Sequence, residues 1–141
     1  MRRGGRGLTM VELAVALVVI GVLAAFAGPR FMAAAERSKA GEAFNYLSAV
    51  QAAQERYHSR QGTYASKVTD LDIKLTAPKS FSVGTIGAGT TKSLEDSWKL
   101  TLIRMGAWAG YGEYTVTFNE EGFAGDDSTI NDKPDINPMQ T

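Results

Sequence analysis

The chain has 141 residues, 44% of them hydrophobic, and its 15 basic side chains balance 15 acidic ones. This length suits one domain of ordinary size and argues against a two-domain enzyme, and the lack of cysteine excludes disulfides, Cys-based zinc sites and thiol nucleophiles. Three basic residues, Arg2, Arg3 and Arg6, lie in the first six positions. The rest of the chain holds 12 basic against 15 acidic side chains, so we predict no specific nucleic-acid partner.

An uncharged apolar run of 17 residues extends from Leu13 to Pro29. As a helix it is about 25 Å long, close to the hydrocarbon thickness of a bilayer. Adding Leu8 to Val11 completes a membrane span that includes Glu12. The arginines before the run predict that the N-terminus stays cytoplasmic and that the remainder is exported.

The next segment, up to about Arg60, is amphipathic. Its apolar stripe recurs at helical spacing and comprises Ala40, Ala43, Phe44, Leu47, Val50, Gln54 and Tyr57. The opposite, solvent-facing side is expected to carry Glu36, Lys39, Glu42, Asn45, Glu55 and Arg56. Because proline after a membrane span more often kinks a helix than ends it, we predict one helix from about Leu8 to Arg60, roughly 80 Å long. Gly62 provides the stop signal.

Beyond Gly62 the periodicity changes to that of strands. Short strands are predicted at 81–83, 98–104 and 114–118, separated by turns. An antiparallel sheet of three or four strands, packed on the amphipathic half of the helix, gives an α+β fold. Residues 125–141 contain two prolines and many Asn and Asp side chains, so we expect a C-terminal loop or tail there.

The residues around Gly7 form a motif. The segment Gly7-Leu8-Thr9-Met10-Val11-Glu12-Leu13, after a basic leader and before the apolar run, resembles the processing signature of type IV pilins and of the pseudopilins of type II secretion. The resemblance implies cleavage after Gly7 by a prepilin peptidase, N-methylation of Leu8, and a role in assembly for Glu12 at the fifth mature position. Leu8 stands where phenylalanine is usual.

This resemblance divides the chain into four parts and implies its partners. They are a cleaved leader (1–7), a transmembrane or filament-core half of the helix (8–29), an amphipathic half (30–62), and a globular sheet region with its C-terminal loop or tail (63–141). The implied protein is a structural subunit, not an enzyme, and needs no cofactor. Its partners would be further copies in a filament, the peptidase and methyltransferase, and an inner-membrane assembly platform. It would reside in the bacterial inner membrane before joining an extracellular pilus, or a periplasmic filament if it is a pseudopilin.

Glu12 has a physical reason to matter. A charged group inside an apolar span costs on the order of 2.5–3.5 kcal/mol at mid-membrane, so its carboxylate needs a partner. Cleavage after Gly7 would create one, because the new amine of Leu8 lies one helical turn before Glu12 or faces the Glu12 of a neighbouring subunit. Methylation would keep the charge of that amine.

Two further sites are expected. Gly21, Gly28 and Pro29 hold the helix backbone weakly, and we predict local loss of helical hydrogen bonds between Gly21 and Pro29 in an assembled filament. Four aspartates close together in the C-terminal segment suggest a calcium site, because hard cations bind carboxylates and major pseudopilins as a class hold calcium in this region. These are Asp126, Asp127, Asp132 and Asp135.

Three alternatives remain open at this stage. Arg2, Arg3 and Arg6 with Ala25-Phe26-Ala27 also fit an ordinary secretory signal peptide, although Glu12 interrupts the apolar segment. A plain membrane anchor for an exported binding domain would make Glu12 an incidental interfacial charge. Within the resembling family, the motif does not separate a pilin, our first choice, from a pseudopilin.

Overall fold

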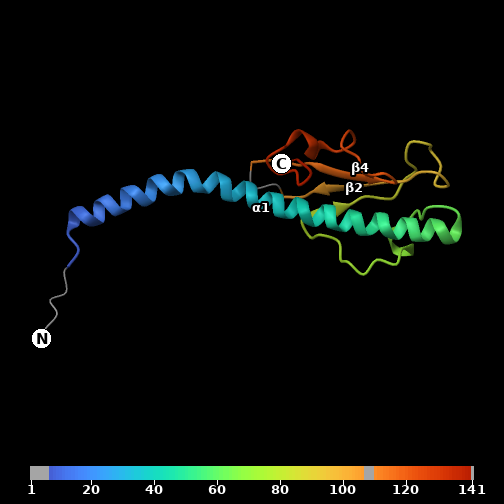
Figure 1. Cartoon of the computed structure of the whole chain (residues 1–141), viewed down its shortest axis with the longest axis horizontal. Coiled ribbons are helices and arrows are strands. Elements are labelled where there is room, and N and C mark those ends of the chain that lie inside the picture. Colours follow the sequence, from blue (N-terminus) through green and yellow to red (C-terminus); the bar gives the residue numbers. More distant parts are fainter. Residues whose placement is uncertain (1–6, 107–109, 141) are drawn as a thin grey trace, which may run out of the picture.

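The computed structural model describes residues 7–106 and 110–140, so the leader arginines and Trp108 lie outside the described part. One long helix, α1 (Met10–Gln61), runs along a four-stranded antiparallel sheet and projects far beyond it (Figure 1). The strands, in spatial order, are β1 (Phe81–Val83), β2 (Lys99–Arg104), β3 (Thr115–Asn119) and β4 (Gly122–Phe123). Two short 3-10 helices, η1 (Val68–Asp70) and η2 (Thr129–Asp132), complete the fold, and the predicted α+β class is confirmed.

Both ends of α1 are closed by local hydrogen bonds. At the start, Thr9 and Glu12 form a capping box, so the helix begins at Met10 and not at Leu8. At the end, Gly62 has a left-handed backbone (φ 73°), and its N–H donates to the carbonyl of His58 at 2.8 Å. Glycine adopts this conformation without a Cβ penalty, which is why the helix stops here, as predicted.

Pro29 does not interrupt α1. The helix is continuous from Met10 to Gln61, although proline lacks the amide hydrogen that the helix would use there. Figure 1 shows that the projecting half curves gently. The predicted loss of hydrogen bonds between Gly21 and Pro29 concerns the assembled filament and stays a prediction.

The sheet is a meander of neighbouring strands. Leu102 lies opposite Val116 in the β2–β3 pair, and Phe81 lies opposite Arg104 in the β1–β2 pair. The three predicted strands are confirmed within one residue at each end. β4 was not predicted, because two residues are too few to show an alternating pattern.

The core lies between the second half of α1 and one face of the sheet. Leu47 and Val50 of the helix are fully buried with Trp98, Leu100 and Val116. The C-terminal segment closes this core, because Ile130 and Ile136 are also fully buried. The expected loop or tail is therefore a packed part of the domain, and its two isoleucines among polar residues were missed.

Candidate functional site

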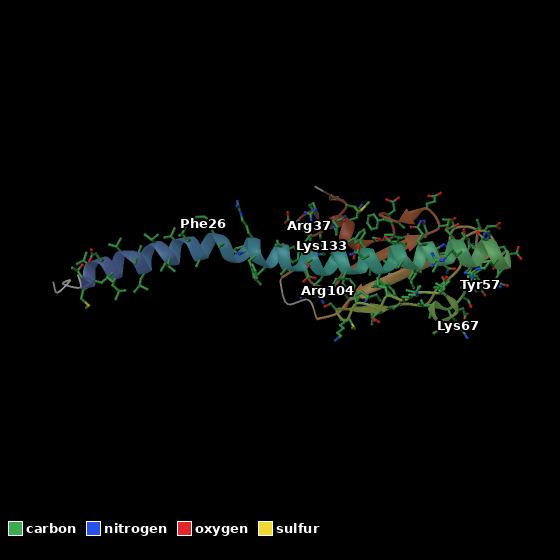
Figure 2. All side chains as sticks on the ribbon, turned by 60° about the horizontal axis from the view of Figure 1, so that its bottom comes forward. Phe26, Arg37, Tyr57, Lys67, Arg104 and Lys133 are labelled. Carbon is green, nitrogen blue, oxygen red and sulfur yellow. The ribbon has the colours of Figure 1, made fainter. Side chains whose placement is uncertain are left out.

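The first part of α1, from Met10 to Met32, is exposed at every residue. Between Gly7 and Ala35 no described residue is buried, and large apolar side chains such as Leu8 and Phe26 are 78% and 74% exposed. Figure 2 shows Phe26 and its neighbours standing out from the ribbon with no facing element. This part of α1 is also long and apolar enough to cross a membrane.

Exposure of so many apolar side chains to water is unfavourable. Soluble monomers rarely expose a continuous apolar patch larger than a few hundred Å², and larger patches mark contacts with proteins or membranes. In this segment the charge-free run 13–29 covers every side of the helix, which is typical of helices surrounded by lipid or by other apolar helices. The monomer therefore leaves its most apolar surface without a partner.

The capping box places Glu12 at the N-terminal end of this apolar segment. Its carboxylate accepts hydrogen bonds from the backbone N–H and from the hydroxyl of Thr9, both at 2.8 Å. The Glu12 N–H in turn donates to the Thr9 hydroxyl at 3.2 Å. Thr9 was not singled out from the sequence, although the Thr-x-x-Glu spacing is the usual signal of a capping box.

Gly7 and Leu8 precede this cap as an exposed, non-helical segment. In the chain described here Leu8 is still joined to Gly7, so it has a peptide N–H and no free amine. The pairing of Glu12 with the amine of Leu8 is thus untested and stays a prediction. What the geometry does show is that the carboxylate lies at the start of the helix, four residues after Leu8, with Thr9 as its hydrogen-bond partner.

The second half of α1 begins with a buried ion pair. We expected Glu36 on the solvent-facing side, and this was wrong, because only 2% of it is exposed. Its carboxylate accepts two hydrogen bonds from the Arg104 guanidinium, at 2.6 and 3.1 Å, and a third from the Tyr114 hydroxyl at 2.8 Å. Arg104 also donates to the carbonyls of Ser80 and Met105.

This ion pair joins α1 to β2 and to the residue before β3. The hydrogen bond from Arg104 lowers the pKa of the Glu36 carboxyl below its ordinary value, in opposition to the desolvation that raises it. Burial, and then the acceptor carboxylate, raise the pKa of Tyr114, so that its hydroxyl keeps the proton it donates. The network therefore stays ionised, and it fixes the point at which the helix enters the domain.

Comparisons with known proteins concern mainly the N-terminal part of the chain. Residues 2–28 match the family model described as the prokaryotic N-terminal methylation motif. The chain is similar to type IV pilins, chiefly in its N-terminal part. It is 28% identical over 121 residues to fimbrial protein EcpC of Eikenella corrodens, a match that covers 84% of this chain and 79% of that protein.

A second relative matches a shorter part. The pilin-like chain is 36% identical over 66 residues to type IV major pilin protein PilA of Myxococcus xanthus strain DK1622. This match covers 47% of the chain and 30% of PilA, so it spans less than a third of that relative's own length. The resemblance noted from the motif is confirmed, and the coarse assignment does not separate pilins from pseudopilins.

The four aspartates of the expected calcium site are exposed on the C-terminal segment. They are Asp126, Asp127, Asp132 and Asp135. Within residues 7–106 and 110–140, no group of three or more Asp, Glu or His side chains is close enough together to hold a metal ion. Calcium binding by this chain stays a prediction, and the positions of the four aspartates add no support to it.

Proposed function

We propose that this chain is a structural subunit of a type IV pilus filament. A prepilin peptidase cleaves between Gly7 and Leu8, Leu8 is methylated on its new amine, and the apolar half of α1 inserts first into the inner membrane and then into the filament core. The observation that carries the proposal is that residues 8–32 are all exposed, next to a domain with a buried core. One helix that leaves such a surface open needs a second apolar environment, and a bundle of like helices provides one.

The partners in this proposal are further copies of the same chain, the peptidase and methyltransferase, and an inner-membrane assembly platform. The similarity to a fimbrial protein and to a major pilin supports the pilus over other filaments. The protein acts through assembly, and no catalytic residue is assigned. A pseudopilin in a periplasmic filament is the competing outcome, and immunogold labelling of cells at native expression separates the two, because only a pilin forms long surface fibres.

Processing is tested by the mass of the mature N-terminus. We expect a chain that begins at Leu8 and carries one methyl group on its amine. Gly7→Glu should block cleavage, because a side chain there meets the peptidase at the scissile bond, whereas Gly5→Glu is the matched control that leaves cleavage intact. A mature chain that begins at Gly28 would instead establish an ordinary signal peptide and overturn the proposal.

Assembly is tested at Glu12. Glu12→Ala removes a carboxylate that would be buried among neighbouring helices, so we expect membrane insertion at the wild-type level or better and at least about tenfold fewer filaments. Glu12→Asp should be intermediate, since it keeps the charge and shortens the reach. Glu42→Ala, an exposed glutamate on the packed half of α1, is the control. A wild-type filament yield from Glu12→Ala would refute the pairing.

A further inference from the structure

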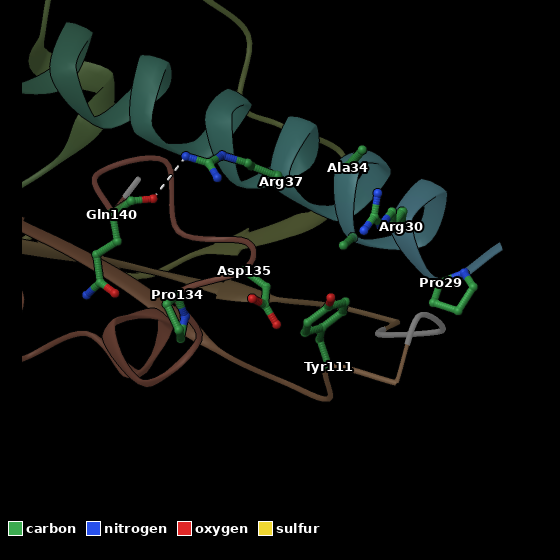
Figure 3. A pocket seen from close by; sticks show the side chains of 9 residues that line it. Pro29, Arg30, Ala34, Arg37, Tyr111, Pro134, Asp135 and Gln140 are labelled. Atoms are coloured by element: carbon green, nitrogen blue, oxygen red, sulfur yellow. Dashed lines mark hydrogen bonds between the residues drawn. The ribbon is translucent and has the colours of Figure 1, made fainter. Parts of the chain in front are cut away.

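An open pocket of about 810 Å³ lies where α1 leaves the domain. One wall is the part of α1 from Pro29 to Arg37, and the other comes from Tyr111 and the C-terminal segment (Figure 3). Its lining includes Pro29, Arg30, Arg37, Tyr111, Asp135 and Gln140. The pocket thus lies between the end of the apolar run and the globular domain.

The pocket presents two positive groups and one negative group. Arg30 and Arg37 are seven residues apart, which places both on one face of the helix, and Asp135 lies on the facing wall (Figure 3). Arg37 donates to the carbonyl of Gln140 at 3.0 Å. Among the residues that the structure describes, none of these three charged side chains forms an ion pair. Their charges remain available to a ligand.

The position of the pocket matches the depth of lipid headgroups. Arg30 is the first charged residue after the run 13–29, and Arg37 lies about 10 Å further along the helix. The headgroup layer adds roughly 5–8 Å to each side of the hydrocarbon core, and long arginine side chains reach into it. Tyr111 is half-buried at the pocket, and amphipathic aromatic rings are enriched at this depth.

We propose that, while the subunit resides in the membrane, this pocket binds the headgroup of a phospholipid that carries a phosphate and a primary amine. The phosphate lies between the guanidinium groups of Arg30 and Arg37, which suit phosphate oxygens, and the ammonium lies at the carboxylate of Asp135. A quaternary ammonium lacks the N–H donors that this carboxylate would accept, and a headgroup without an amine leaves Asp135 beside a negative charge. This inference rests on the proposed membrane-inserted subunit.

The test uses the full chain in bilayer nanodiscs made from equal parts of phosphatidylcholine, phosphatidylethanolamine and phosphatidylglycerol. Native mass spectrometry of the released protein counts the lipids retained by headgroup. We expect phosphatidylethanolamine to be retained about tenfold over the other two, the size of one charge-assisted hydrogen bond. Arg30→Gln with Arg37→Gln should abolish this retention. Asp135→Asn should remove the preference over phosphatidylglycerol and keep phosphate binding.

Two control variants each remove one charge of the same kind away from the pocket. Arg60 lies near the C-terminal end of α1, and Asp127 lies elsewhere on the C-terminal segment; both residues are exposed. The controls are Arg60→Gln and Asp127→Asn. Near-ultraviolet circular dichroism checks that each variant keeps its packed domain. Equal retention of the three lipids, or equal loss in the control variants, would overturn the inference.

Other outcomes separate this inference from the proposed function. Cross-links from Arg37→Cys to a second copy within the nanodisc, in place of lipid, would mean that the pocket receives a neighbouring subunit, and the lipid inference would fail. A chain that does not remain in the bilayer would contradict the proposed function as well. A chain that inserts but shows no headgroup preference would contradict the lipid site alone.

Discussion

The two halves of α1 share one unbroken backbone and differ in everything their side chains meet. The half before Ala35 has no buried residue, whereas the half from Glu36 onward buries a stripe against the sheet. Helical hydrogen bonds and end caps set how long the helix is, and they act alike in both halves. The two halves differ in their tertiary contacts: the second half packs on the sheet, and the first half needs a lipid or protein partner for its apolar side chains. The boundary is marked by Glu36, the one charged side chain that α1 buries.

The largest effect is expected from breaking that boundary. Glu36→Leu leaves Arg104 buried without its counter-ion, and we expect a loss of about 3–5 kcal/mol in the free energy of unfolding of the domain. Urea unfolding of the full chain in detergent micelles, followed by near-ultraviolet circular dichroism, measures it. Adding Arg104→Leu should recover part of the loss, because no unpaired charge then remains. A loss below about 1 kcal/mol in the single variant would show that the ion pair does not hold the helix entrance.

The same substitution in the two halves gives the next effect. Leu47→Ala removes a fully buried side chain and should destabilise the domain by about 2–5 kcal/mol. Leu17→Ala removes an exposed one, and the free energy of unfolding of the domain should change by less than about 0.5 kcal/mol. Among the molecules that fold, Leu17→Ala should reduce the filament yield more than Leu47→Ala does. Equal destabilisation by both variants would erase the distinction between the halves.

Glycine-to-alanine changes in and after α1 should have smaller effects on helix stability, with opposite signs at Gly62 and Gly21. Gly62→Ala forces a side chain into the left-handed region and should destabilise the end of α1 by about 1–2 kcal/mol. Gly21→Ala should instead strengthen the projecting half by up to about 1 kcal/mol, which hydrogen exchange of its amides would report as slower exchange. In a filament, a map with continuous helical hydrogen bonding from Leu13 through Ala35 would contradict the predicted local loss before Pro29.

A pH dependence should give the smallest change under ordinary conditions. Since the folded pKa of Glu36 is lowered below its ordinary value of 4.5, its contribution is complete above pH 4.5 and is lost as the pH falls through the folded pKa. The urea midpoint should therefore be level near neutrality and fall in acid. Glu36→Gln should flatten this fall. Asp72→Asn, which removes an exposed carboxyl paired with Arg56, is the control and should flatten it less.

Local patterns in the sequence predicted those parts of the fold that depend on near neighbours. The helix, its glycine stop and three strands follow from periodicity and turn residues, and the motif around Gly7 pointed to the family. Glu36 was misplaced because a charged residue ordinarily faces water, and its partner Arg104 lies 68 residues away. Ile130 and Ile136 were missed because each is isolated among polar residues, so only the folded chain shows that they complete the core.

The cap at the start of α1 has a consequence for maturation. Thr9 and Glu12, which close the helix, both lie downstream of the bond between Gly7 and Leu8, and so do all three hydrogen bonds between them. A peptidase that cuts this bond would act on a short non-helical segment, and all three hydrogen bonds of the capping box would stay in place. The helix would then need no refolding between precursor and mature protein, and the trimmed subunit would be ready to move as soon as its leader is gone.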